Sequence, residues 1–120
     1  MGISPAASHE EHNMLYSYPP DSRVMLYTGM GPKGRNVILV RSADACVFVG
    51  GGMGTLNEFT IAFDELSPRC AIGILTSTGG LSDELSRLVS LTGRSPRAPL
   101  VAEPDPDKLM EALFRHLRSQ

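Results

Sequence analysis

The residues best suited to chemistry form a glycine-rich turn between an apolar segment and an amphipathic one. The turn reads Gly50-Gly51-Gly52-Met53-Gly54-Thr55, and Glu58 follows three residues later. Glycines let a ligand approach the backbone closely, and the amides at a helix start attract anions, helped by the positive end of the helix dipole. The pattern predicts a phosphate site whose binding residues are Gly51, Gly52, Gly54 and Thr55.

Two common nucleotide-binding motifs are absent from the sequence. Asn57 stands where the G-x-G-x-x-G dinucleotide fingerprint would place its last glycine. The segment Gly29 to Gly34 is followed by Arg35-Asn36 and not by the Lys-Ser/Thr of a Walker A loop. The predicted anion site is therefore of another kind.

Each polar residue near these glycines has two interpretations. Arg35 is either a surface cation beside an acid or a planar cation that grips a phosphate or the carboxylate of Glu58. Asn36 either caps the following helix or holds a ribose hydroxyl. Thr55 and Glu58 also fit a capping box, in which both side chains bind free amides at the helix start and touch no ligand.

The remaining candidate residues give weaker indications. Thr78-Gly79-Gly80 is first a tight turn and second a source of ligand contacts from Gly79 and Gly80. His9 and His12 form at most a weak metal pair, so we predict neither a metal nor a cofactor. Cys46 and Cys70 lie in apolar runs, which favours buried, reduced thiols over a disulfide.

Composition excludes several classes of protein. The chain has 120 residues, 42% of them hydrophobic, with a net charge of −2, which predicts one domain over residues 1–120. There is no basic excess for binding nucleic acid. No apolar run is long enough to span a membrane, and no signal peptide is evident at the start, so we expect a cytoplasmic protein.

Apolar runs and turn residues alternate along the chain in a β-then-α order. Residues Asn36–Val40 have strand propensity. The link from this segment to the expected strand Ala45–Val49 is too short, however, for the crossover that joins two parallel strands, so a helix is favoured. The pattern begins with a short segment at residues 2–5. Strands are then expected at 24–28, 45–49, 71–76 and 100–102. Expected helices are a short one that begins at a Ser8–Glu11 capping box, then 36–40, 55–66, 82–91 ending near Gly93, and 106–117 capped by Asp105.

This order predicts an α/β Rossmann-like fold, a parallel sheet with helices on both faces and Ala45–Val49 as a central strand. Ligands bind at the carboxyl ends of such strands, so the loops after Thr28, Val49 and Thr76 mark the expected site. In the helix 55–66, the core positions are Leu56, Phe59, Phe63 and Leu66. Glu58 is displaced from that stripe and can face a ligand.

Three segments of the sequence resemble the Lonely Guy (LOG) superfamily, whose members are often labelled possible lysine decarboxylases. The segments are Gly29-Met30-Gly31-Pro32-Lys33-Gly34-Arg35-Asn36, Ala43-Asp44 and Gly50 to Glu58. Within the superfamily, the sequence is most similar to bacterial Rossmann-like proteins related to molybdenum-cofactor carriers. Pyridoxal-dependent decarboxylation needs an active-site lysine, which neither Lys33 nor Lys108 is placed to supply.

The best-known LOG branch hydrolyses the N-glycosidic bond of cytokinin nucleoside monophosphates with an arginine and a P-G-G-x-G-T-x-x-E motif. By resemblance, Arg35 matches the arginine and Glu58 the glutamate, which implies catalytic roles, while Gly50 replaces the proline. The resemblance also implies a homodimer. Family members have earlier strands and a first phosphate-facing turn before the segment that Gly2–Pro5 matches. We therefore expect a truncated product, a fragment or a minimal member.

Three functional hypotheses follow. In the first, the protein is a phosphoribohydrolase in which Glu58 stabilises positive charge on the ribose of a nucleoside 5′-monophosphate and Arg35 holds the glutamate or phosphate. In the second, it binds or carries a nucleotide or the molybdenum cofactor without catalysis. In the third, it keeps only the fold and contributes an oligomer surface.

Overall fold

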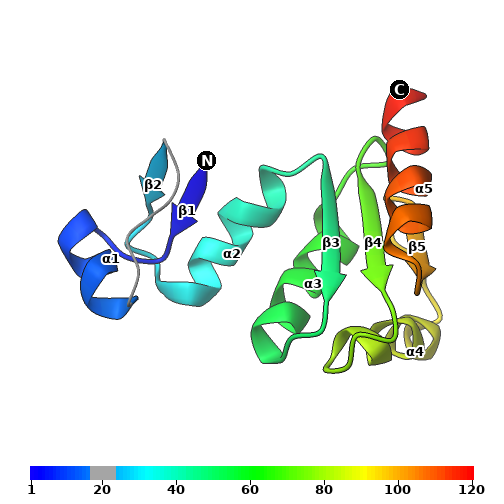
Figure 1. Ribbon diagram of the computed structural model, residues 1–120, viewed down its shortest axis with the longest axis horizontal. Coiled ribbons are helices and arrows are strands. Elements are labelled where there is room, and N and C mark those ends of the chain that lie inside the picture. The colour runs from blue at the N-terminus through cyan, green and yellow to red at the C-terminus, as the bar shows by residue number, and fades with distance from the viewer. Residues whose placement is uncertain (17–23) are drawn as a thin grey trace. The chain divides into compact units, whose positions relative to one another are not determined.

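The computed structural model describes residues 1–16 and 24–120. By their contacts the residues form two compact units, 1–39 and 40–120, and the expected single domain stays a prediction. Strands and helices alternate along the chain (Figure 1), in the order β1 (Gly2–Ser4), α1 (His9–Leu15), β2 (Met25–Tyr27), α2 (Gly31–Arg41), β3 (Ala45–Val49), α3 (Met53–Glu65), β4 (Ala71–Leu75), α4 (Ser82–Thr92), β5 (Leu100–Glu103) and α5 (Pro106–Arg118).

The first unit contains a two-stranded parallel sheet, β1 beside β2, with α1 between them in sequence. Ser8 caps the start of α1 as predicted, but the Glu11 carboxylate binds the amide of Ala7 and not that of Ser8. The Glu11 amide donates to Ser8 Oγ at 3.2 Å, and the Glu11 carboxylate accepts from the Ala7 amide at 2.7 Å. These bonds satisfy the Glu11 amide, which the helix itself leaves free, and the amide of Ala7 just before the helix, which is why so short a helix has a defined start.

Helix α2 begins at Gly31, before the predicted start at Asn36. Its segment 36–40 is helical as predicted, but residues 31–35 were expected in a loop and that expectation is wrong. Glycine and proline lower helix propensity in a helix interior, but proline is well suited to a first turn, whose amides have no intrahelical acceptor. Pro32 lies in that first turn.

The second unit is built on a parallel sheet in the order β3-β4-β5. Cys46 pairs with Ile72 and Ile72 with Leu100, so side chains at matching positions share a face. Together with the parallel pairing in the first unit, this arrangement confirms the predicted α/β class with parallel sheets.

Helices cover both faces of this sheet, giving three layers. Side chains of α3 and α4 pack on one face, in a core that includes Phe48, Phe59, Phe63, Ile72, Ile74 and Leu85. Helix α5 packs on the opposite face through Leu109 and Leu113. The predicted stripe on α3 is confirmed, because Phe59, Phe63 and Leu66 are buried and Leu56 is partly buried against the same core.

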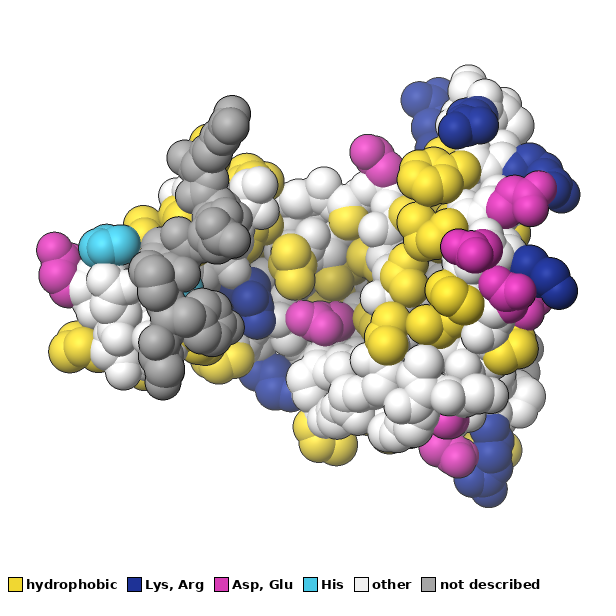
Figure 2. Space-filling view, in the orientation of Figure 1, with side chains coloured by type: hydrophobic (Ala, Val, Ile, Leu, Met, Phe, Trp, Pro, Cys, Tyr) yellow, Lys and Arg dark blue, Asp and Glu magenta, His cyan; other side chains and the backbone are white. Residues whose placement is uncertain are grey.

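Strand β3 lies at one edge of the β3-β4-β5 sheet, whereas the sequence predicted a central strand. Its residues are all apolar, as in strands buried on both faces, yet α5 packs on β4 and β5. Val47 and Val49 are therefore 40% and 53% exposed. Figure 2 shows hydrophobic side chains gathered over β3, β4 and α5.

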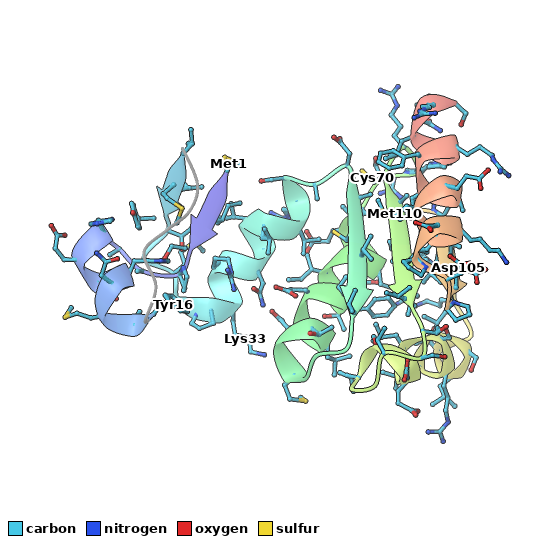
Figure 3. The ribbon with its side chains drawn as sticks, in the orientation of Figure 1. Met1, Tyr16, Lys33, Cys70, Asp105 and Met110 are labelled. Carbon is cyan, nitrogen blue, oxygen red and sulfur yellow. The ribbon has the colours of Figure 1, made fainter. Side chains whose placement is uncertain are left out.

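The ends of the later helices follow the predicted signals. Asp105, at the start of α5 (Figure 3), accepts hydrogen bonds from the amides of Asp107 and Lys108, and Pro106 occupies the first turn. Helix α4 ends at Gly93, whose φ of 64° is the left-handed conformation that glycine adopts without strain. Within residues 1–16 and 24–120, no helix combines the length and apolar character needed to cross a membrane.

Candidate functional site

The predicted glycine-rich turn joins the carboxyl end of β3 to α3. Gly50 and Gly51 have φ values of 55° and 81°, and Gly52 is the residue before the helix. The first helical hydrogen bond runs from the Leu56 amide to the Gly52 carbonyl at 3.1 Å. The amides of the residues before Leu56 in this first turn have no acceptor within the helix. Gly52 holds the capping position, and no side-chain hydrogen bond caps these amides among the described residues. The start of α3 is therefore open to an anion.

The capping-box interpretation of Thr55 and Glu58 is wrong. Helix α3 begins at Met53, so Thr55 already lies inside the first turn and is not the capping residue. The helix starts early because Gly52 serves as the residue before it without a side-chain bond. Thr55 instead lies against the turn: a Cβ atom on Gly51 would stand 1.9 Å from Thr55 Oγ1.

The loop between β4 and α4 braces this turn. Thr78 Oγ1 accepts from the Gly50 amide at 3.0 Å. The amides of Leu81 and Ser82 donate to the carbonyls of Gly51 and Gly50 at 2.9 and 3.0 Å. The structure therefore brings together two loops that the sequence assigned to the same sheet edge.

Gly79 and Gly80 occupy the bracing loop. The Gly79 amide donates to Asp83 Oδ2 at 2.9 Å, and a Cβ atom on Gly80 would stand 2.6 Å from the Gly51 carbonyl oxygen. Sequence reasoning missed Asp83 and the bracing role of Thr78. An acid in the first turn of α4, following a Thr-Gly-Gly turn, was the available signal, because such side chains bind free backbone amides.

Glu58 lies half-buried in α3, near enough to Cys46 of β3 for its charge to act on that thiol. The pKa of the Cys46 thiol is raised to about 11, first by burial, then by the nearby Cys70 and by the charge of Glu58. Cys46 and Cys70 are both free thiols. Glu58, which the sequence predicted to be catalytic, lies one turn into the helix that follows the glycines.

This raised pKa predicts an alkaline loss of stability. Between about pH 9 and pH 11 the unfolded thiol loses its proton while the folded thiol keeps it, so the free energy of unfolding falls as pH rises through this window. Urea unfolding of the wild type and of Cys46→Ala at pH 8, 9 and 10.5 measures the effect. We expect the alanine variant to lose less stability on the alkaline side. Equal losses would show that Cys46 titrates normally.

Arg35 and Asn36 lie in the first unit, within α2. Arg35 NH1 donates to the Ile3 carbonyl and its Nε donates to Asn36 Oδ1, both at 3.1 Å. Asn36 is buried and lies in the middle of α2, so the hypothesis that it caps the helix is wrong. Arg35 is likewise a helical residue and not part of a loop. Glu58 belongs to the second unit, 40–120.

Each histidine forms a hydrogen bond with another protein group, but among the described residues His12 Nε2 is buried without a partner. His12 Nδ1 lies 2.9 Å from Ser4 Oγ in a buried hydrogen bond, and His9 Nδ1 lies 3.1 Å from the Tyr27 hydroxyl. Among residues 1–16 and 24–120 there is no cluster of three or more His, Cys, Asp or Glu suited to a metal ion.

Residues 1–100 match the model of the SLOG cluster4 family. The chain belongs to this family. The SLOG superfamily includes the LOG-like Rossmann proteins, so the resemblance of the glycine turn is supported at the level of the superfamily.

Two further proteins are similar to this one. An uncharacterized protein from Archaeoglobus fulgidus is 50% identical over 42 residues, which are 35% of this chain and 27% of the relative. The X-ray structure of TM1055 matches with a TM-score of 0.63 and 24% identity, over 81% of this chain and 56% of that one. The chain thus spans 27% of the length of the archaeal relative and 56% of the length of TM1055. The likeness to TM1055 supports the Rossmann-like fold.

Proposed function

We propose that this SLOG protein is a cytoplasmic protein that binds a phosphorylated small molecule, a nucleotide above all, at the turn from Gly50 to Thr55. The observation that supports it most is the uncapped start of α3, where first-turn amides adjoin an exposed glycine run. A phosphate there would accept hydrogen bonds from these amides and interact with the helix dipole. The family match supports the same class of ligand.

The glycines at positions 52 and 54 add a second argument. A Cβ atom on either residue would meet nothing within 4 Å, so packing of the protein does not require glycine there. Glycine inside a helix costs about 1 kcal/mol relative to alanine. Close approach of a ligand accounts for glycine at Gly54, where the local structure would be more stable with alanine.

Hydrolysis of a nucleoside 5′-monophosphate to a free base and ribose 5-phosphate is the catalytic form of this proposal. The bond from the ribose to the base breaks as positive charge develops on the sugar, and a water oxygen bonds to the anomeric carbon. Glu58 would stabilise that charge and orient the water.

A non-catalytic carrier of a nucleotide or of the molybdenum cofactor is the second candidate. Gly50, where the hydrolytic branch has proline, favours it. The engagement of Arg35 with the Ile3 carbonyl and Asn36 also favours it, because a cation already bonded to protein groups is less available to a ligand. Both candidates share the phosphate site and differ in chemistry.

Nucleoside monophosphates should raise the melting temperature, whereas the matching nucleosides should do so far less, since only the former carry the phosphate. The measurement is a thermal shift over the same concentration series for adenosine, cytidine, guanosine and inosine and their 5′-monophosphates.

Gly54→Ala tests whether the monophosphates bind at the glycine turn. It should be at least as stable as the wild type without ligand, because the added methyl group has room and alanine favours the helix. It should lose most of the shift produced by monophosphates. Equal shifts from nucleosides and monophosphates, or an unaltered response in Gly54→Ala, would contradict phosphate binding at this turn.

A further inference from the structure

The loop between β4 and α4 contains a residue in a backbone conformation that its type disfavours. Ser77 has a φ of 62°, and every other residue with a positive φ, in the part of the chain that the structure describes, is a glycine. In this left-handed region the Cβ atom of an L-residue crowds the following carbonyl oxygen, whereas glycine has no Cβ atom. Gly79 and Gly80, in the same loop, follow the usual pattern. Serine at position 77 is therefore the exception that needs a reason.

Hydrogen bonds on both sides of Ser77 hold the loop in this conformation. The Thr76 amide donates to the Glu103 carbonyl at 3.1 Å, and the Thr78 hydroxyl donates to the Leu75 carbonyl at 3.0 Å. A strained residue persists where the surrounding structure fixes it in this way. The turn thus requires a left-handed residue at position 77, but it does not require a hydroxyl group there.

The Ser77 hydroxyl is free and lies beside the candidate site. The side chain is exposed, and its oxygen has no hydrogen-bond partner among residues 1–16 and 24–120. Val49 and Leu75 are partners in register, so the glycine turn and the loop with Ser77 leave the sheet side by side. The next residue, Thr78, accepts a hydrogen bond from the Gly50 amide at 3.0 Å. An unused donor is therefore held on a fixed loop that is braced against the glycine turn.

We propose that the Ser77 hydroxyl donates a hydrogen bond to the phosphate group of the ligand at the glycine turn. This inference rests on the proposed function and adds to it a side-chain donor from the neighbouring loop. A phosphate group offers three strong acceptor oxygens, more than one set of amides at the start of α3 needs to share. A hydrogen bond to a charged acceptor is about twice as strong as one between neutral groups. Such a bond explains why the position keeps a serine where glycine would be unstrained.

Two substitutions separate the hydroxyl group from the backbone strain. Ser77→Ala removes the hydroxyl but keeps a residue that the left-handed region disfavours, so the melting temperature without ligand should stay close to that of the wild type. Ser77→Gly removes both, so the melting temperature without ligand should rise. Both variants should bind ribose 5-phosphate, and each nucleoside monophosphate that the wild type binds, about tenfold more weakly. Isothermal titration calorimetry measures the Kd.

Ser90→Ala is the matched control, because Ser90 is an exposed serine near the end of α4 whose hydroxyl donates to the Arg87 carbonyl at 2.7 Å. It should leave the Kd unaltered. Unchanged affinity in both Ser77 variants, in a protein whose Gly54→Ala variant has lost binding, would overturn this inference and leave the glycine turn as the phosphate site.

Three other results would also count against it. Weaker binding of nucleotides without weaker binding of ribose 5-phosphate would place the contact on the base and not on the phosphate. A Ser77→Gly variant that melts no higher than the wild type would show that the backbone at this position is unstrained. A wild type that binds neither ribose 5-phosphate nor any of the monophosphates would contradict the proposed function itself.

Discussion

Replacing Glu58 with glutamine is expected to reduce the release of free base from nucleoside 5′-monophosphates at least about a hundredfold. Glutamine keeps the size of the side chain but removes the charge that would stabilise the developing oxocarbenium ion. Affinity for the nucleotide should change little, because in the proposed site backbone amides, and not Glu58, would bind the phosphate. Release of base from adenosine, cytidine, guanosine and inosine monophosphates measures the rate, and thermal shift measures binding.

Glu65→Gln is a suitable control, since Glu65 lies on the same helix but forms an exposed ion pair with Arg41. It should leave both rate and affinity as in the wild type. Nucleotide binding by the wild type without release of base from any of the four monophosphates would exclude the hydrolase and leave the carrier. Release that persists undiminished in Glu58→Gln would assign the chemistry to another residue.

Gly80→Ala should lower the free energy of unfolding by about 2–3 kcal/mol. Gly80 has a φ of 64°, where alanine is strained, and the added Cβ atom would stand 2.6 Å from the Gly51 carbonyl oxygen. That oxygen accepts the Leu81 amide, so the substitution pushes apart the two loops that form the candidate site. Urea unfolding measures the loss.

Gly79→Ala separates the contribution of backbone strain from that of the collision with the Gly51 carbonyl. Gly79 has a φ of 77°, but a Cβ atom there would meet nothing within 4 Å, so this variant carries the backbone strain without the collision. It should cost about 1 kcal/mol. If both substitutions destabilised the protein equally, the close packing between the loops would not contribute to stability.

The bracing of the glycine turn bears on ligand binding as well as on stability. The carbonyls of Gly50 and Gly51 accept hydrogen bonds from the amides of Ser82 and Leu81, and the Thr78 hydroxyl accepts one from the Gly50 amide. These bonds hold the turn in place before any ligand arrives. A turn that is already ordered loses less conformational entropy on binding, which favours affinity.

Local patterns in the sequence determined most of the helices and strands. Ser8 with Glu11, Asp105 with Pro106, and Gly93 predicted helix ends correctly, because each acts on backbone groups within a few residues. The spacing of Phe59, Phe63 and Leu66 predicted the buried side of α3 for the same reason, since helical periodicity is a property of the segment itself.

Other features depended on contacts between residues distant in the sequence. An all-apolar segment such as Ala45–Val49 indicates burial, but whether a strand lies at the centre or the edge depends on what packs beside it. Likewise, Gly80 could be recognised as a turn residue, but only its approach to Gly51 shows what its missing side chain permits. The bonds of Arg35 to the Ile3 carbonyl and of Thr78 to the Gly50 amide also arise only on folding. Residue types and spacing specify local backbone preferences, whereas the partner of each side chain is decided by the tertiary structure.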